Sequence, residues 1–280
     1  MEFPVMSIII MMILAVGMFY GQAQYKKKRA EWGKTLTIFC GIFIIITALW
    51  TNLCRSPIDT DAIHREREYQ RVQAVVLANS LANMYTGTGR KCLVIHHPVS
   101  ENSRDDVDRL VAAFKEGLGD SVDEVIAAPI KDIDMDAELI PEEAMMEMTA
   151  EDFNKVIKDN SGCDMVISMV PLPFSEDEIY AMNIFKMIED PDNPNIWIKD
   201  PKIKYPLLGI YNGYVGNLEP LFLEKLIGAM TLWRPNPTID EEDVPSDIME
   251  AFNKRYITIT PATLNAVKGQ YPNLFPKPKK

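Results

Sequence analysis

The sequence predicts a mainly parallel, doubly wound α/β domain that is preceded by two transmembrane helices. Two long runs without charge, residues 3–20 and 36–53, indicate the membrane helices. Farther along the chain, short apolar runs typical of buried strands alternate with amphipathic segments typical of helices. We therefore expect a two-span hairpin at residues 1–54, a helical stalk at residues 55–86, and an external α/β domain at residues 87–280.

Both apolar runs have the length and composition of membrane spans. Each is about as long as a helix must be to cross roughly 30 Å of hydrocarbon. A core helix of a water-soluble domain would be shorter and would carry a polar stripe, which neither run has. The first run follows Glu2 and no positive charge, so we expect it to be retained rather than cleaved as a secretory signal. Neither run contains Asp, Glu, Lys, Arg or His, which argues against ion transport through them.

A cationic connection between the two runs predicts the orientation of the chain. By the positive-inside rule, the basic loop at residues 25–34 stays in the cytoplasm. The N-terminus and the large C-terminal domain then lie on the external, periplasmic side of the inner (cytoplasmic) membrane. The residues that determine this topology are Lys26, Lys27, Lys28, Arg29 and Lys34.

The charge balance limits the partners of the external domain. The chain has 29 Lys and Arg residues against 40 Asp and Glu residues, and five of these cations lie in the short basic loop. An acidic domain of this kind repels nucleic acid, which is bound through basic surfaces. The expected partners are the lipid bilayer and other membrane or envelope proteins, with a second copy of this chain among them.

The segment before the α/β domain is predicted to be one long helix. It contains no proline after Pro57 and no glycine before Gly87, and Tyr69, Val72 and Val76 recur at helical intervals. We expect its second half to pack on the domain, while the charged residues 65–71 form a solvated stalk.

Strand-like and helix-like segments then follow one another in a regular order. Thr149 is a predicted helix cap, and Ser103 with Asp106 and Ser175 with Glu178 have the spacing of capping boxes. Strands that are apolar on both faces and joined by helices predict a parallel sheet of the flavodoxin-like or Rossmann-like kind. Two insertions interrupt the order: residues 131–148 are acidic and methionine-rich, and residues 189–206 are rich in proline and aspartate. The second is predicted to contain a small hairpin around residues 196–204. The predicted strands are residues 91–97, 123–130, 163–173, 205–213, 228–233 and 256–260.

The pattern resembles one lobe of the type I periplasmic binding-protein fold. The resemblance rests on three stretches, "KCLVIHHPVSENSRDDVDRLVAAFKEGLG", "CDMVISMVPLP" and "PLLGIYNGYVGNLEPLFLEKLIGAMTLWRPN". It implies that the loops after the strands contact a small molecule. The chain departs from that family because it is too short for two full lobes.

A candidate ligand site lies at the carboxyl ends of the predicted strands, where open α/β sheets bind ligands. The start of the helix after the first strand would favour an anionic group, because its amides are free to donate. The alternative is structural, since serine and asparagine suit turns and helix caps. The candidate residues are His96, His97, Ser100, Asn102 and Ser103 after the first strand, Pro171 and Pro173 after the third, and Tyr211, Asn212 and Tyr214 after the fourth.

The four cysteines indicate neither a disulfide framework nor a metal site. Cys92 and Cys163 begin the first and third strands, which are neighbours in a flavodoxin-like order. They could form a disulfide outside the cytoplasm, or remain two separate thiols, which geometry favours. The adjacent His96 and His97 point to opposite faces of a strand, so they do not predict a metal site.

No catalytic signature stands out, so we favour a non-enzymatic protein without a cofactor over the third alternative, an anchored hydrolase or transferase. There is no G-x-S-x-G motif and no paired-carboxylate or metal-ligand pattern. The predicted function is a membrane-anchored envelope protein whose external domain is a subunit or protein-interaction module of a membrane complex. The alternative is a small-molecule sensor that binds an anionic ligand near His96, Asn102 and Tyr211.

Overall fold

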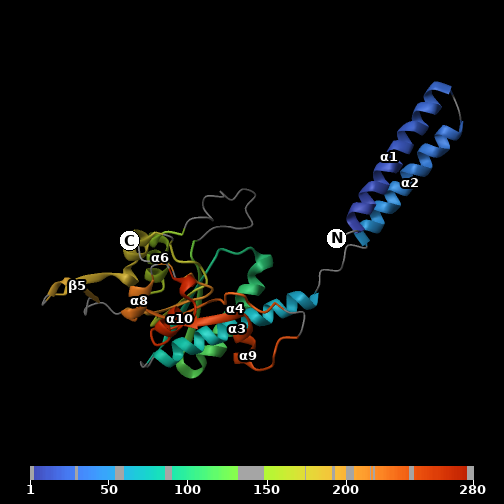
Figure 1. Cartoon of the computed structure of the whole chain (residues 1–280). Helices are drawn as coiled ribbons and strands as arrows, with labels where there is room; N and C mark the ends of the chain where they lie inside the picture. The colour runs from blue at the N-terminus through green and yellow to red at the C-terminus, as the bar shows by residue number, and fades with distance from the viewer. Residues whose placement is uncertain are drawn as a thin grey trace. The chain divides into compact units, whose positions relative to one another are not determined.

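The computed structural model divides the chain into two compact units, Met1–Ile63 and His64–Lys280 (Figure 1). Each unit is described by itself. The structure describes residues 3–28, 31–53, 60–85, 90–131, 148–173, 175–190, 193–199, 205–214, 216, 218–239 and 243–275. The first insertion, apart from its ends, and Cys54 and Arg29 of the predicted hairpin lie outside the described residues.

The first unit is a helical hairpin of α1 (Phe3–Lys28) and α2 (Glu31–Leu53). The helices approach closely where Gly21 of α1 faces Gly33 of α2, because a Cβ atom on either glycine would meet the other's carbonyl oxygen. The Thr37 hydroxyl donates to the Gly33 carbonyl oxygen at 2.8 Å, within α2. Among the residues whose side chains are described, no helix is both long enough and apolar enough to cross a membrane.

The second unit is built on a six-stranded sheet with the order β2-β1-β3-β6-β7-β8. The first five strands pair in parallel, and β8 is antiparallel at one edge. This order is the flavodoxin-like one, with the switch point between β1 and β3, so the predicted mainly parallel α/β sheet is confirmed. The strands are β1 (Lys91–His96), β2 (Glu124–Pro129), β3 (Met165–Ser168), β6 (Leu207–Ile210), β7 (Ile227–Trp233) and β8 (Tyr256–Ile259).

A separate antiparallel hairpin is formed by β4 (Met187–Asp190) and β5 (Asn193–Lys199). It lies within and just before the second predicted insertion, so the expected small hairpin is present but begins earlier than predicted. Short 3₁₀ turns join several elements: η1 (Glu101–Ser103), η2 (Gly119–Ser121), η3 (Asn183–Phe185) and η4 (Pro272–Leu274).

Helices cover both faces of the large sheet. The side chains of β1 alternate: Cys92 and Val94 pack in the cluster of α3 and α4, whereas Leu93 and Ile95 pack in the cluster on the opposite face. The first face carries α3 (Thr60–Met84), α4 (Arg104–Leu118) and α9 (Ile248–Arg255). The second carries α6 (Ala150–Asp159), α7 (Glu176–Ala181), α8 (Glu219–Leu223) and α10 (Leu264–Gln270).

The predicted packing of the second half of helix α3 on the α/β unit is confirmed, because Leu77 and Leu81 are completely buried. The charged first half differs from the predicted solvated stalk. Tyr69 is completely buried, Glu66 pairs with Arg255 at 2.6 Å, and Arg71 pairs with Glu116 at 2.8 Å. The compact unit therefore begins at His64 rather than near Gly87.

Hydrogen bonds at helix caps link α6 and α7 on the second face of the sheet. The predicted cap Thr149 is confirmed, and it forms a full capping box with Asp152. Ser175 caps α7 by accepting from the Glu178 amide at 3.1 Å. The Glu178 carboxylate does not complete that capping box but accepts from the Ala150 amide at 2.7 Å, which ties the starts of α6 and α7 together.

Candidate functional site

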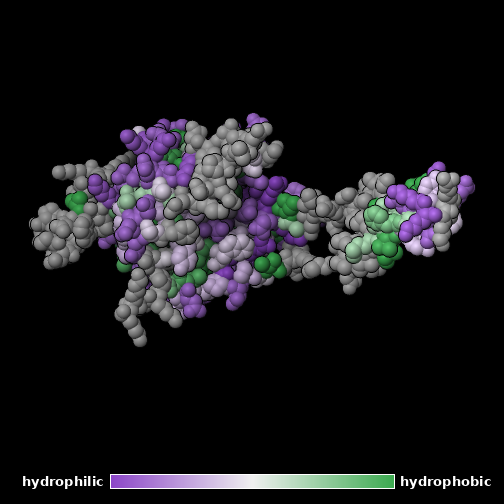
Figure 2. All heavy atoms as spheres, turned by 90° about the horizontal axis from the view of Figure 1, so that it is seen from above, coloured by the Kyte–Doolittle hydropathy of each residue, from purple (hydrophilic) through white to green (hydrophobic). Residues whose placement is uncertain are grey.

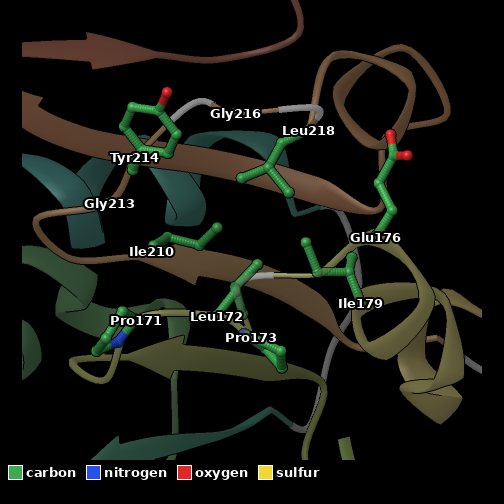
Figure 3. A pocket seen from close by; sticks show the side chains of 10 residues that line it. All are labelled: Pro171, Leu172, Pro173, Glu176, Ile179, Ile210, Gly213, Tyr214, Gly216 and Leu218. Atoms are coloured by element: carbon green, nitrogen blue, oxygen red, sulfur yellow. The ribbon is translucent and has the colours of Figure 1, made fainter. Parts of the chain in front are cut away.

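A cavity of about 260 Å³ lies at the carboxyl ends of β3 and β6 (Figure 3). It opens on the face of the sheet that carries α7 and α8. Figure 3 shows Leu172, Ile179, Ile210 and Leu218 grouped between Tyr214 at one end and Glu176 at the other. The described residues that line it are Pro171, Leu172, Pro173, Glu176, Ile179, Ile210, Gly213, Tyr214, Gly216 and Leu218.

The cavity is apolar except at its two ends. The four grouped aliphatic residues are all buried members of the main hydrophobic core. Glu176 is exposed at the first turn of α7, and the Tyr214 side chain is 77% exposed. The site therefore presents an apolar floor with a carboxylate at one end and an aromatic ring at the other.

Local turns after the two strands shape this cavity. After β3, the buried Ser168 hydroxyl donates to the Val170 carbonyl oxygen at 2.6 Å and fixes the turn into Pro171. After β6, Asn212 adopts a left-handed conformation with φ 56°, which asparagine tolerates better than most residues. The Gly213 amide then donates to the Thr231 carbonyl oxygen of β7 at 2.9 Å. Because of this turn, the chain reverses direction before Tyr214.

The predicted residues after β1 form a turn away from this cavity. His96 is buried, and its Nδ1 donates to the carbonyl oxygen of His97 at 2.6 Å. Desolvation, and then the neighbouring His96, lower the pKa of His97. Ser103 is the N-cap residue of α4, but its hydroxyl accepts no capping hydrogen bond and instead lies 3.3 Å from the Ser100 hydroxyl. The Asn102 side chain lies outside the described residues.

The predicted tyrosines after β6 are separated by the sheet. The Tyr211 ring packs edge-on against Phe114 of α4 at a centroid distance of 5.7 Å, and its hydroxyl donates to the Gln70 carbonyl oxygen at 3.4 Å. Tyr211 thus belongs to the α3 and α4 face, whereas Tyr214 lines the cavity on the other face. Of the predicted candidate residues, Tyr214 and the two prolines after β3 line this cavity.

Sequence reasoning missed Glu176 and the aliphatic floor of the cavity. A signal was available, because the predicted cap Ser175 places Glu176 at the start of the helix that follows β3. In the sequence, Leu172, Ile179, Ile210 and Leu218 look like ordinary core residues. Whether such residues line a cavity depends on the turns after β3 and β6, which the sequence pattern does not give.

Cys92 and Cys163 are free thiols in the structure. Cys92 is buried in the cluster of α3 and α4, whereas Cys163 packs against the core on the other face. In the register of β1 and β3, Cys92 lies opposite Met165 rather than Cys163. The separate-thiol alternative is the one that the structure shows. Among the described residues, no three His, Cys, Asp or Glu side chains gather to hold a metal ion.

The buried side chains of Cys92 and Tyr256 and the partly buried side chain of Tyr211 make the stability of the α/β unit sensitive to alkali. Burial raises the pKa of Cys92 to about 12 and raises the pKa of Tyr211 and Tyr256. Because the unfolded chain releases these protons first, the stabilisation is complete below about pH 9 and is lost as pH rises above it. We expect the free energy of unfolding to fall between about pH 9 and 12.

Tyr211→Phe should reduce the slope of this fall with pH by up to about 1.4 kcal/mol per pH unit. Urea unfolding of the full chain in detergent at several pH values measures the slope for the unaltered chain and for Tyr211→Phe. An unchanged slope in the variant would contradict the raised pKa of Tyr211.

No protein-family model, no curated protein and no solved structure matches the chain.

Proposed function

We propose that this chain is a membrane-anchored protein whose α/β unit is a protein-interaction module of a membrane complex. The observation that carries the proposal is the helical hairpin, whose helices direct large apolar side chains outward. Figure 2 shows apolar (green) patches on the described atoms of the hairpin and a largely hydrophilic (purple) visible face on the α/β unit.

The outward apolar side chains of the hairpin support membrane anchoring. They recur on successive turns of both helices and remain between 43% and 68% exposed although α1 and α2 pack together. Apolar surface of this extent is unfavourable in water and is favourable in contact with lipid or with other apolar helices. The residues are Met12, Ile13, Val16, Phe19 and Tyr20 of α1, and Ile38, Phe39, Ile42 and Phe43 of α2.

The cationic turn between the two helices supports an orientation. Lys26, Lys27 and Lys34 are exposed at the same end of the hairpin. With this end in the cytoplasm, the N-terminus and the α/β unit lie on the external, periplasmic side of the membrane.

The cavity at the ends of β3 and β6 favours contacts with a protein over catalysis. Its floor is apolar, and its only acidic lining residue, Glu176, has no histidine, cysteine or second carboxylate beside it among the described lining residues. Catalytic sites gather convergent titratable groups, whereas protein interfaces are built from apolar and aromatic anchors with a polar rim.

A second candidate function follows from the location of the cavity. Ligands of open α/β sheets bind beyond the carboxyl ends of the strands, and this cavity lies there. A small-molecule binding module that resembles a periplasmic binding-protein lobe is consistent with that location. Native mass spectrometry of the purified chain distinguishes the two candidates, because only the second predicts a retained small molecule.

Alkaline carbonate extraction tests the membrane anchor. The full-length chain should remain in the membrane pellet, because carbonate removes proteins held by surface contacts alone. The double variant Ile13→Lys/Ile42→Lys should be released, since each central lysine costs about 2.5–3.5 kcal/mol in a membrane helix. Ile239→Lys adds a charge at an exposed position of the α/β unit and should stay in the pellet. Release of the unaltered chain would refute the anchor.

A further inference from the structure

We propose that the cavity at the ends of β3 and β6 receives a large apolar side chain of a partner protein that is flanked by a lysine or arginine. This inference rests on the proposed role as a protein-interaction module and assigns the chemistry of its contact surface. The lining residues of this cavity form the β3–β6 groove.

The size and lining of the β3–β6 groove suit one anchoring side chain. Its volume of about 260 Å³ lies just below the range of roughly 300–1,000 Å³ that is typical of sites for whole small molecules. Leu172, Ile179 and Ile210 provide an apolar floor, and Pro171 and Pro173 provide a stiff rim. A buried aliphatic or aromatic anchor in such a pocket is a common source of binding energy at protein interfaces.

The carboxylate at one end of the groove favours a cation in the occupant. Glu176 is exposed, and no lysine or arginine lines the groove or pairs with Glu176 among the described residues. The next residue, Asp177, is also an exposed carboxylate. An anionic ligand would be repelled at this end, whereas an ammonium or guanidinium group beside the anchor would be attracted.

The exposed ring at the other end of the groove favours the same occupant. Tyr214 is 77% exposed and, as Figure 3 shows, stands at the end opposite Glu176. An exposed tyrosine can cover an apolar side chain with its ring and attract a cation to its face. The acidic balance of the chain adds a long-range attraction for such a partner.

A pair of small probes tests this chemistry without knowledge of the partner. 2-Phenylethylammonium carries an aromatic group and a cation, and 3-phenylpropionate carries the same ring with an anion. The full chain in detergent is labelled at isoleucine methyl groups, and each probe is added up to about 20 mM, since so small a ligand binds weakly. The cation should shift the Ile179 and Ile210 methyl signals, and the anion should not. Equal shifts by both probes, or none by either, would overturn the proposal.

Two matched substitutions test whether the carboxylate of Glu176 attracts the cationic probe. Glu176→Gln should weaken binding of 2-phenylethylammonium about three- to fivefold, the range expected for an exposed ion pair. Glu224→Gln removes an exposed carboxylate on the same face, after α8 and outside the groove, and should change binding less than twofold. Equal effects of the two variants would show that only the net charge matters and would refute the assignment to Glu176.

The native complex provides the second test. In membranes solubilised with mild detergent, Glu176→Lys should lose the partner, whereas Glu224→Lys should retain it. A complex that survives Glu176→Lys would refute the groove as its contact and leave the proposed function intact. A chain that runs alone without any substitution would refute the proposed function itself, and the probe experiment would still report the chemistry of the groove.

Discussion

Gly117→Ala is expected to destabilise the α/β unit by about 2–3 kcal/mol, as overpacked sites do. Gly117 lies in α4 where this helix crosses α3. A Cβ atom at Gly117 would overlap the carbonyl oxygen of Val75 and would lie 2.8 Å from the Cβ atom of Ala78. The backbone of α3 cannot move aside without disturbing Leu77 and Leu81, which are completely buried. The helix preference of alanine offsets only part of this cost.

Urea unfolding of the full chain in detergent measures the loss of stability. It is followed through the fluorescence of Trp233, with Trp32, Trp50 and Trp197 replaced by phenylalanine. Gly269→Ala is the matched control, because Gly269 lies in α10 with no atom within 4 Å of the added Cβ position. This control should stabilise the unit by about 0.5–1 kcal/mol. If the two variants have the same stability, the close crossing of α3 and α4 is wrong.

Glu66→Gln is expected to cost about 2–3 kcal/mol, because it leaves the buried guanidinium of Arg255 without its carboxylate. The Arg255 side chain is 5% exposed, and it lies over the Tyr69 ring at 3.5 Å from the ring centroid. Removing one partner of a buried ion pair typically costs about 3–5 kcal/mol. The expected value is smaller because Glu66 is 44% exposed, so water reaches one side of the pair.

The pair formed by Lys91 and Glu124 provides the control for this substitution. Its atoms lie 2.6 Å apart, as in the first pair, but both side chains are 50% exposed. Glu124→Gln should therefore cost no more than about 1 kcal/mol. Equal losses in the two variants would show that the stability of the α/β unit does not depend on the pairing of Arg255 with Glu66.

The sheet could be predicted because its local signals agree. The alternation of Cys92, Leu93, Val94 and Ile95 suits a strand that is buried on both faces, and each strand is followed by a segment with helical periodicity. The cap at Thr149 was predictable for the same reason, since its hydrogen bonds involve residues only three positions apart.

The pairing of the charged first half of α3 could not be predicted, because its contacts join distant parts of the chain. A charged helical segment such as residues 65–71 has the same sequence pattern whether it is solvated or paired. The pairing of Glu66 with Arg255 depends on where α9 and β8 lie, and no local signal gives that position.

The cavity lies at the edge of the sheet where the candidate site was predicted, but most of its lining residues are different ones. The strand-end rule identified Pro171, Pro173 and Tyr214, which line the groove. It also selected Tyr211, only three residues from Tyr214, which packs on the opposite face of the sheet. The left-handed turn at Asn212 separates them, and its direction does not follow from the sequence pattern.

The mass of the full-length chain after gentle detergent extraction tests the central claim most directly. Membranes that contain the chain at its natural level would be solubilised, and the assembly would be measured by native mass spectrometry with identification of its components. The proposed function predicts an assembly larger than the 31.8 kDa chain, with defined protein neighbours. A chain that runs as a monomer with no protein neighbour would contradict it.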